Sequence, residues 1–237
     1  MFNLSNIPLV IFAGGLGTRM RGVKDKLPKP MIKICGIPII ARIINHYAKF
    51  GVKNFIICGG YKVKIIKDYF KKNRFNDLDI NVVNTGKFTM TGGRLKIIRN
   101  YIKSNNFFLT YGDGISNVSI KKLYKFHLKN KKIATCLAVY PPARYGALTI
   151  NKNTVTSFVE KPNFKNKNEG WINGGFFVLK NSIFKYLKDE NTIFERKPLE
   201  KLSKIKQLGA MKYKGFWRCM DTPKDKEEIE KYLRTKI

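Results

Sequence analysis

Short apolar runs that end in glycine pairs alternate along this chain with amphipathic segments. The first run, Pro8 to Ala13, ends at Gly14-Gly15, and a second, Asn54 to Cys58, ends at Gly59-Gly60. An uninterrupted apolar run is typical of a strand buried on both faces, and such strands occur mainly in parallel sheets covered by helices. The alternation therefore predicts an α/β fold with a doubly wound, mostly parallel (Rossmann-like) sheet.

Helical spacing and turn signals place the other expected elements. Apolar residues from Ile39 to Phe50 recur at helical spacing, and Gly51 follows where a C-terminal cap belongs. Further helices are expected at about 62–70, 94–103 and 120–128. Further strands are expected at 80–84, 107–111, 133–140 and 171–179, with a hairpin of two short strands at 147–150 and 154–158.

Two later helices have sequence signatures at their starts. Thr222-Pro223 is an N-cap followed by proline at the first helical position. Thr192 with Glu195 three residues later is the pattern of a capping box, and it predicts a helix that reaches the region of Lys201. The chain shows no linker, repeat or low-complexity tract, so residues 1–237 are expected to form one domain.

The chain is strongly basic, with 47 Lys and Arg against 16 Asp and Glu and a formal charge of +31. A polyanionic partner and a uniformly basic surface both explain this excess. Most of the basic residues are Lys and no long basic run occurs, so we expect no nucleic-acid partner. No apolar stretch approaches the ~18 residues of a membrane span, and no signal peptide is recognisable at the start, which predicts a cytoplasmic protein without a membrane partner.

Cysteine and histidine chemistry offers little material. Cys35, Cys58, Cys136 and Cys219 are far apart and contain no CxxC pair, which indicates buried, reduced thiols. The two histidines, His46 and His127, fall at polar positions of expected helices. A zinc site or a Ser-His-Asp triad is therefore not expected.

A glycine-rich loop, Gly14-Gly15-Leu16-Gly17-Thr18-Arg19, follows the first strand. Such loops bring backbone N–H groups close to an anion, and a neighbouring basic side chain neutralises it. The loop is not a Walker A loop, because no Lys-Ser/Thr pair follows Gly22. It also lacks the third small residue and the downstream acid of the dinucleotide fingerprint.

The segment Leu27-Pro28-Lys29-Pro30-Met31 comes soon after the loop. Proline fixes its own φ and restricts the residue before it. We therefore expect the segment around Lys29 to be extended and its ammonium to be held by a stiff backbone.

Together, GGLGTR and PKPM resemble the signature of the sugar-1-phosphate nucleotidylyltransferases. Six downstream motifs are similar to the glucose-1-phosphate cytidylyltransferase family in particular: MTGGRLK (90–96), TYGDG (110–114), PPARYGAL (141–148), EKP (160–162), INGGFFVL (172–179) and GFWRCMDT (215–222). The resemblance covers nearly the whole chain in order. It implies transfer of a cytidylyl group from CTP to a sugar 1-phosphate, giving a CDP-sugar for surface polysaccharide synthesis and pyrophosphate.

The resemblance also assigns roles to residues. Arg19 and Lys29 would be catalytic, stabilising the α-phosphorus during attack. The nucleotide would contact Phe12, Ala13, Gly14, Gly15, Leu16, Gly17, Thr18, Arg19, Lys29, Thr89, Arg94 and Gly112. The sugar phosphate would contact Gly146, Glu160, Lys161, Asn173 and Gly174. Residues 1–115 would mainly bind the nucleotide, and 116–237, with a small mixed β portion, mainly the sugar phosphate.

Asp113 and Asp221 would hold the metal ion, Mg²⁺, that this chemistry uses. Taken alone, Asp113 is equally well explained as a turn former and Asp221 as part of a helix cap. Two alternatives stay open: another nucleoside triphosphate, UTP, dTTP or GTP, and another phosphorylated acceptor. The segment before the MTGGR motif is shorter than in the family, and the chain is compatible with a homo-oligomer.

Overall fold

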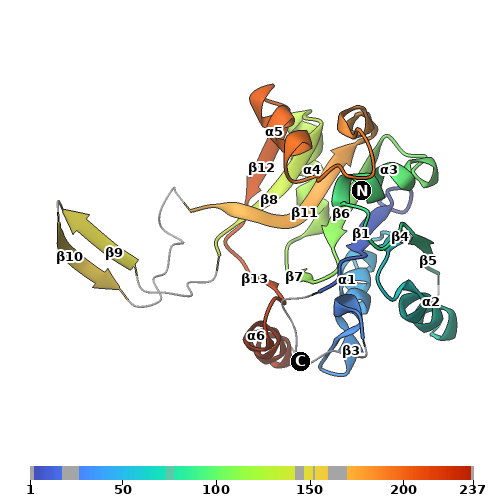
Figure 1. The fold of residues 1–237 in the computed structure, drawn as a ribbon, viewed down its shortest axis with the longest axis horizontal. Helices are drawn as coiled ribbons and strands as arrows, with labels where there is room; N and C mark the ends of the chain where they lie inside the picture. The colour runs from blue at the N-terminus through green and yellow to red at the C-terminus, as the bar shows by residue number, and fades with distance from the viewer. Residues whose placement is uncertain are drawn as a thin grey trace.

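A seven-stranded sheet forms the centre of the molecule. The computed structural model describes residues 3–17, 27–73, 75, 77–141, 147–151, 153–159 and 170–235. The strands of the sheet are β1 (Leu9–Ala13), β4 (Asn54–Gly59), β5 (Asp79–Asn84), β6 (Asn106–Tyr111), β8 (Ala134–Val139), β11 (Ile172–Lys180) and β12 (Leu208–Lys212). Their order is β12-β8-β11-β6-β1-β4-β5, and β11 runs antiparallel to both neighbours in an otherwise parallel sheet (Figure 1). The predicted doubly wound, mostly parallel fold is confirmed.

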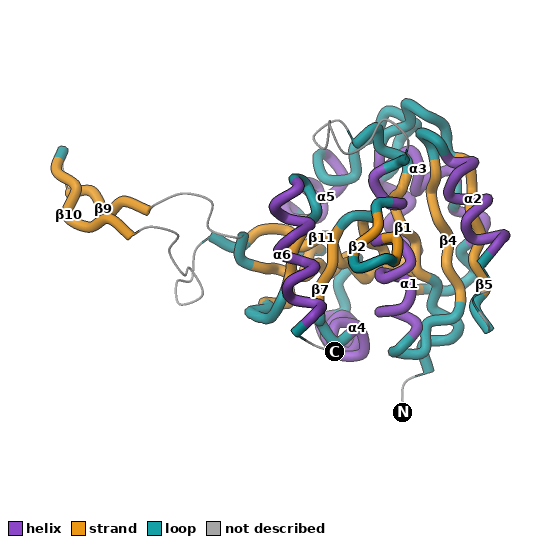
Figure 2. The backbone as a smooth tube through the Cα atoms, turned by 90° about the horizontal axis from the view of Figure 1, so that it is seen from below, coloured by secondary structure: helices purple, strands orange, loops and turns teal. Residues whose placement is uncertain are grey.

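Helices cover both faces of this sheet. They are α1 (Ile39–Ala48), α2 (Val63–Lys72), α3 (Thr91–Ile97), α4 (Ile120–Asn130), α5 (Lys197–Lys204) and α6 (Pro223–Arg234), with 3-10 turns η2 (Lys29–Met31), η3 (Arg99–Tyr101) and η5 (Asn181–Tyr186). Alternate residues of a strand point to opposite faces. Leu9 and Ile11 of β1 therefore pack in one core with α1 and α4, whereas Val10 and Phe12 pack in a second core with α3, η5 and α5. Figure 2 shows the strands between these helices.

Three small antiparallel sheets complete the fold. They pair β2 (Lys33–Ile34) with β3 (Ile37–Pro38), β7 (Gly114–Ser116) with β13 (Trp217–Cys219), and β9 (Ala147–Asn151) with β10 (Thr154–Val159). The predicted hairpin is confirmed as β9 and β10, which stand apart from the body of the molecule (Figures 1 and 2). The β7–β13 pair joins the middle of the chain to its C-terminal region.

Two predicted helix starts differ from the structure. The helix expected from Arg94 begins at Thr91, because carbonyl groups of residues 190 and 192 satisfy the N–H groups of its glycine-containing first turn. The helix expected after Thr192 begins only at Lys197. Thr192 does not cap that helix, because its Oγ1 donates to the Asp189 carboxylate at 3.1 Å. The predicted start at Thr222 is confirmed, because its hydroxyl accepts a hydrogen bond from the third residue of α6.

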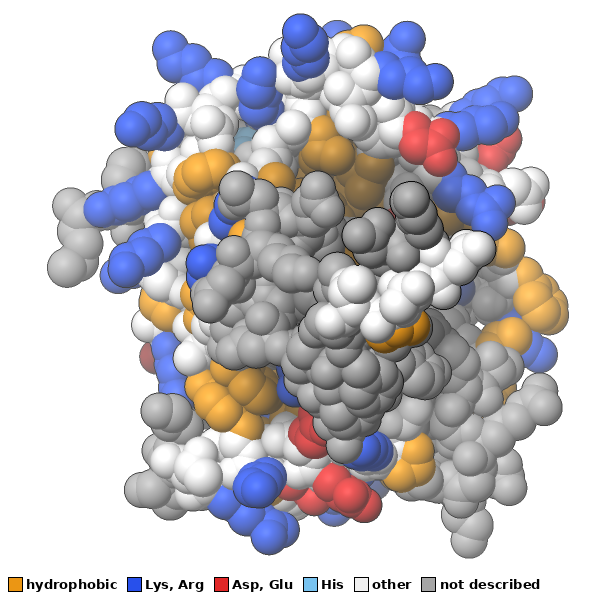
Figure 3. Space-filling view, turned by 90° about the vertical axis from the view of Figure 1, so that its left-hand side faces the viewer, with side chains coloured by type: hydrophobic (Ala, Val, Ile, Leu, Met, Phe, Trp, Pro, Cys, Tyr) orange, Lys and Arg blue, Asp and Glu red, His pale blue; other side chains and the backbone are white. Residues whose placement is uncertain are grey.

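The structure also shows the surroundings of the histidines, cysteines and basic residues. His127 is buried, with Nδ1 2.9 Å from Thr135 Oγ1 and Nε2 3.3 Å from Asn106 Oδ1, so its prediction as a polar-face residue is wrong. All four cysteines are free thiols, and Cys58 is buried. Lys and Arg side chains are scattered around the face shown in Figure 3. No helix in the described part of the chain is long and apolar enough to cross a membrane.

Candidate active site

A cavity of about 340 Å³ opens at the carboxyl ends of β1 and β6. The chain continues from β1 to β4 on one side and returns through β6 on the other, so the cavity lies at the switch point of the doubly wound sheet, where such folds bind ligands. The cavity is lined by Phe12, Ala13, Gly14, Gly15, Gly17, Lys29, Pro30, Thr89, Met90, Thr91, Arg94, Tyr111, Gly112 and Asp113. Its volume lies within the range of small-molecule sites.

The glycine-rich loop forms one wall of the cavity. Gly17 has φ +64°, a left-handed conformation that favours glycine, and a Cβ built on it would lie 3.2 Å from Cβ of Lys29. The loop therefore packs directly on the lysine segment. Leu16, which the resemblance assigned to the nucleotide, has 47% of its surface exposed and is not among the lining residues. Thr18 and Arg19 lie outside the described residues.

Lys29 begins the 3-10 turn η2, so the expectation of an extended segment at this residue is wrong. Pro28 is extended, but its carbonyl accepts a hydrogen bond from Met31 N–H at 2.8 Å, and the fixed φ of Pro30 suits such a turn. The turn directs the Lys29 ammonium at two carboxylates. Nζ lies 2.6 Å from Asp113 Oδ2 and 2.8 Å from Asp221 Oδ1.

Burial by itself would lower the pKa of Lys29. The negative charge of Asp113 and the hydrogen bonds to both carboxylates outweigh that effect, so the pKa of Lys29 is raised above its ordinary value. The lysine therefore stays protonated at neutral pH. It is a cation in the lining of the cavity.

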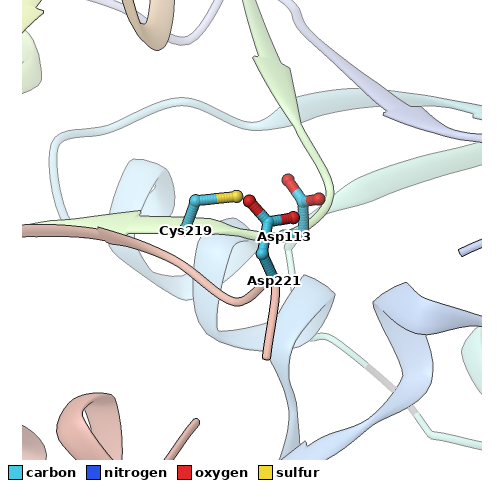
Figure 4. Close-up of side chains that lie close together, drawn as sticks. All are labelled: Asp113, Cys219 and Asp221. Carbon is cyan, nitrogen blue, oxygen red and sulfur yellow. The ribbon is translucent and has the colours of Figure 1, made fainter. Parts of the chain in front are cut away.

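Asp113 and Asp221 come together because β7 pairs with β13. The N–H of Met220 donates to the Asp113 carbonyl at 2.9 Å, and Figure 4 shows the two carboxylates and the Cys219 thiol close together. Ligand atoms of these three residues lie within 4.8 Å of one another. Burial and the charge of Asp113 raise the pKa of Cys219, so its thiol stays neutral. Two carboxylates suit a hard divalent cation such as Mg²⁺, and a protonated thiol is not required for it.

Arg94 lines the cavity, but its guanidinium is engaged by the protein. Nη1 donates to the carbonyls of Gly59 (3.1 Å) and Gly86 (2.8 Å), and Nη2 donates to the carbonyl of Gly14 (3.1 Å). A Cβ on Gly14 would lie 2.1 Å from Nη1, so this glycine is needed for the contact. Arg94 ties the end of β4 to the loops that follow β1 and β5, and its contact with the nucleotide stays a prediction.

The expected sugar-phosphate residues are only partly described. Asn173 and Gly174 lie in β11 where its register with β8 is interrupted, and the Gly174 carbonyl accepts a hydrogen bond from Trp217 Nε1 at 2.6 Å. Asn173 is exposed, and its Oδ1 accepts from Gly175 N–H at 2.9 Å. These two residues are on the strand next to β6, whose end lines the cavity. Gly146, Glu160 and Lys161 lie outside the described residues.

The sequence does not predict several residues of this region, among them Pro30, Met90, Thr91, Tyr111 and Glu195. Tyr111 and Thr91 line the cavity, and Glu195 accepts hydrogen bonds from both of their hydroxyls. Thr91 belongs to the MTGGRLK motif and Tyr111 to the TYGDG motif, where Tyr111 directly precedes Gly112. Glu195 carries a sequence signal, but its spacing from Thr192 predicts a local capping box and not contacts with Thr91 and Tyr111.

This arrangement defines a class of protein. A glycine loop and a lysine flanked by two carboxylates, at the switch point of a doubly wound sheet, form a site for phosphate chemistry on a nucleotide. The model of the Nucleotidyl transferase family matches residues 9–233. The chain belongs to this family and is a nucleotidyltransferase.

Its relatives point in the same direction. The chain is 41% identical over 244 residues to a glucose-1-phosphate cytidylyltransferase of Salmonella typhimurium, with 93% of each chain covered. It is 37% identical to a probable glucose-1-phosphate cytidylyltransferase of Bacillus subtilis, with 94% of each covered. Among solved structures, HddC from Yersinia pseudotuberculosis complexed with GMP-PN has a TM-score of 0.74 and 27% identity, covering 96% of this chain and 99% of that one. The resemblance predicted from the motifs is confirmed.

Proposed function

We propose that this protein transfers a cytidylyl group from CTP to a sugar 1-phosphate, with glucose 1-phosphate as the acceptor, giving CDP-glucose and pyrophosphate. One observation carries the proposal: the Lys29 ammonium meets Asp113 and Asp221 at the cavity beside the glycine loop. The choice of CTP and glucose 1-phosphate is supported by the two cytidylyltransferase relatives, which align with this chain over at least 93% of both sequences. We place this reaction in the cytoplasm, as a step toward surface polysaccharide.

The reaction brings two anionic groups together, because an oxygen of the sugar phosphate must attack the α-phosphorus of CTP. Each pair of unit charges at ~4 Å opposes this approach by roughly 4 kcal/mol at an effective dielectric constant near 20. Lys29 supplies positive charge at the cavity, held in place by η2 and by the contact with Gly17. Transfer of this kind depends mainly on positioning and charge stabilisation.

Asp113 and Asp221 would hold Mg²⁺, which supplies positive charge to phosphate oxygens when bound. Around them, the backbone of Gly14 and Gly15 would face the nucleotide, with Phe12 and Gly112 on the walls of the same cavity. Arg19 and Thr18 would complete the loop. Asn173, Gly174, Gly146, Glu160 and Lys161 would bind the sugar phosphate.

Replacement of the central residues tests this proposal. Lys29→Ala and Asp113→Ala should each lose roughly a hundredfold or more in kcat while circular dichroism shows that the variants remain folded. Lys33→Ala is the matched control, because Lys33 is an exposed lysine four residues away. Turnover at the unmodified rate in both cavity variants would refute the assignment of roles.

A panel of triphosphates tests the substrate. Pyrophosphate release should be fastest with CTP and glucose 1-phosphate, against UTP, dTTP and GTP with the same acceptor and against other sugar 1-phosphates with CTP. Preference for GTP would move this protein toward relatives that use guanine nucleotides. Absence of release with every pair would refute the activity.

A further inference from the structure

The N-terminus of α3 is covered by a segment that lies about one hundred residues later in the chain. This segment, residues 189–196, is called the strap. Its Glu190 carbonyl accepts from Met90 N–H at 2.9 Å, and its Thr192 carbonyl accepts from the N–H groups of Gly92 (2.8 Å) and Gly93 (3.2 Å). A helix begins with N–H groups that have no partner inside the helix, so the strap satisfies groups that would otherwise be open. A Cβ on Gly93 would lie 2.3 Å from the Glu190 carbonyl oxygen, so the glycine pair is what allows this close approach.

The strap also reaches the cavity through one carboxylate. Glu195 Oε2 accepts from Thr91 Oγ1 at 2.6 Å, and Glu195 Oε1 accepts from the Tyr111 hydroxyl. Thr91 Oγ1 in turn accepts from Phe194 N–H at 2.9 Å, which fixes its proton toward Glu195. Glu195 is half-buried and is not among the lining residues, whereas both of its partners are. The carboxylate therefore stands behind the cavity wall.

The two partners belong to different walls. Thr91 is the first residue of α3, and Tyr111 is the last residue of β6, immediately before Gly112 and Asp113. The Tyr111 ring lies against Gly175, because a Cβ on that glycine would lie 2.6 Å from its Cδ2, and the ring centroid is 5.9 Å from that of the Phe12 ring. The Tyr111 hydroxyl donates to Oε1 of Glu195, so this contact joins the end of β6 to the strap.

We propose that Glu195 is a positioning residue, which holds Thr91 and Tyr111 in the cavity wall so that the nucleoside part of the triphosphate meets a preformed surface. The inference rests on the proposed function only in assigning the nucleotide to this cavity. Glu195 itself touches no substrate. Its removal should therefore weaken nucleotide binding more than it weakens binding of the sugar phosphate, since a site assembled only on binding pays for its own ordering.

Steady-state kinetics with three variants test the proposal, using whichever triphosphate the unmodified enzyme turns over. Glu195→Ala should raise KM for the triphosphate about tenfold and leave KM for the sugar phosphate within about twofold. KM for the triphosphate in Glu195→Gln should lie between the values for Glu195→Ala and the unmodified protein, because the amide oxygen replaces only one of the two carboxylate acceptors. Glu190→Ala is the matched control: its side chain is exposed, and its contribution to the strap is a main-chain carbonyl that the variant keeps.

The coupling of Glu195 to the wall is tested separately. Tyr111→Phe removes one of the two hydroxyl contacts of Glu195. The rise in the free energy of triphosphate binding in the Glu195→Ala/Tyr111→Phe double variant should therefore be clearly smaller than the sum of the rises in the two single variants. Additive effects, a parallel rise of both KM values in Glu195→Ala, or an unchanged KM for the triphosphate would each overturn the proposal. If Glu195→Ala does not fold, Glu195→Gln and Tyr111→Phe decide the question by the same KM split. Failure of the proposed function would appear differently, as unmodified activity in Lys29→Ala and Asp113→Ala.

Discussion

Arg94 offers the sharpest test of how the cavity is built, because its buried guanidinium donates mainly to backbone carbonyls of the protein. Its side chain is 4% exposed, and its five hydrogen bonds reach Gly14, Gly59, Thr85, Gly86 and Lys87. Replacement by methionine keeps an unbranched apolar stem but shortens the side chain and removes every donor. Replacement by lysine keeps the charge but offers one nitrogen where arginine has a fork.

The cost of Arg94→Met follows from what each acceptor retains. The Gly59 carbonyl still accepts from Thr85 N–H at 2.9 Å, and the Gly14 carbonyl from Tyr61 N–H at 3.3 Å, so these two keep a donor. The Gly86 carbonyl loses a bond of 2.8 Å. Hydrogen bonds to charged groups contribute about 1.5–3 kcal/mol each, and the recovered hydration of the guanidinium offsets part of the loss. We expect a net loss of about 2–4 kcal/mol.

Thermal and urea unfolding measure this loss. For a chain of this size the expected loss lowers Tm by roughly 4–16 °C, and Arg94→Lys should lie between Arg94→Met and the unmodified protein. KM for the triphosphate should rise in both variants, because the end of β4 and two loops of its cavity lose their common tie. A stability within 1 kcal/mol of the unmodified protein in Arg94→Met, with unchanged KM, would refute the reasoning.

Three further changes have defined outcomes. Burial lowers the pKa of His127 to about 4 from 6.5, so the folded state prefers neutral imidazole. About 3 kcal/mol of the free energy of unfolding should therefore be lost as pH falls from 6.5 to 4. Urea unfolding of His127→Gln at a series of pH values should lack this part of the pH dependence. Gly175→Ala places a Cβ 2.6 Å from the Tyr111 ring at φ +74°, whereas Gly170→Ala at φ +86° meets nothing within 4 Å; calorimetry should show the first variant at least ~1 kcal/mol less stable than the second, and equal melting temperatures would contradict the steric argument. Thr222→Ala removes the cap of α6 and should cost about 1 kcal/mol in urea unfolding, and an unchanged midpoint would contradict it.

The central strands could be predicted because their signal is local. Pro8 to Ala13 contains only apolar residues, and a strand buried on both faces requires that composition. The same holds for the start of α6, where Thr222 and Pro223 act within one turn. β13 carried no comparable signal, because it is a three-residue strand stabilised by pairing with β7.

The site could be predicted from the sequence only through its motifs. No local pattern shows that Asp221 lies beside Asp113, since the β7–β13 pair that joins them forms between distant parts of the chain. Glu195 shows the opposite case. Its position three residues after Thr192 fits a capping box, but the Thr91 and Tyr111 hydroxyls of the folded protein take both carboxylate oxygens. Hydroxyl donors from distant parts of the chain therefore replace the local backbone donor that a capping box would use.

The charges of the cluster imply that metal and nucleotide binding are coupled. Lys29 carries one positive charge and faces the two carboxylates of Asp113 and Asp221, so this group of three has one negative charge in excess. A triphosphate without a divalent cation is therefore repelled by the cluster, whereas two charges from Mg²⁺ reverse its sign.

Asp221→Asn should separate these effects. Because the variant removes the excess negative charge, it should bind CTP about three- to tenfold more tightly than the unmodified protein in the presence of a chelator, measured by calorimetry. In excess Mg²⁺ the order should reverse, because the variant has lost one of the two carboxylates proposed to hold the ion. Glu228→Gln is the control, since Glu228 pairs with Arg218 at 2.8 Å and its removal changes the net charge equally. Equal affinities of Asp221→Asn and the unmodified protein in chelator would show that the cluster does not repel the nucleotide.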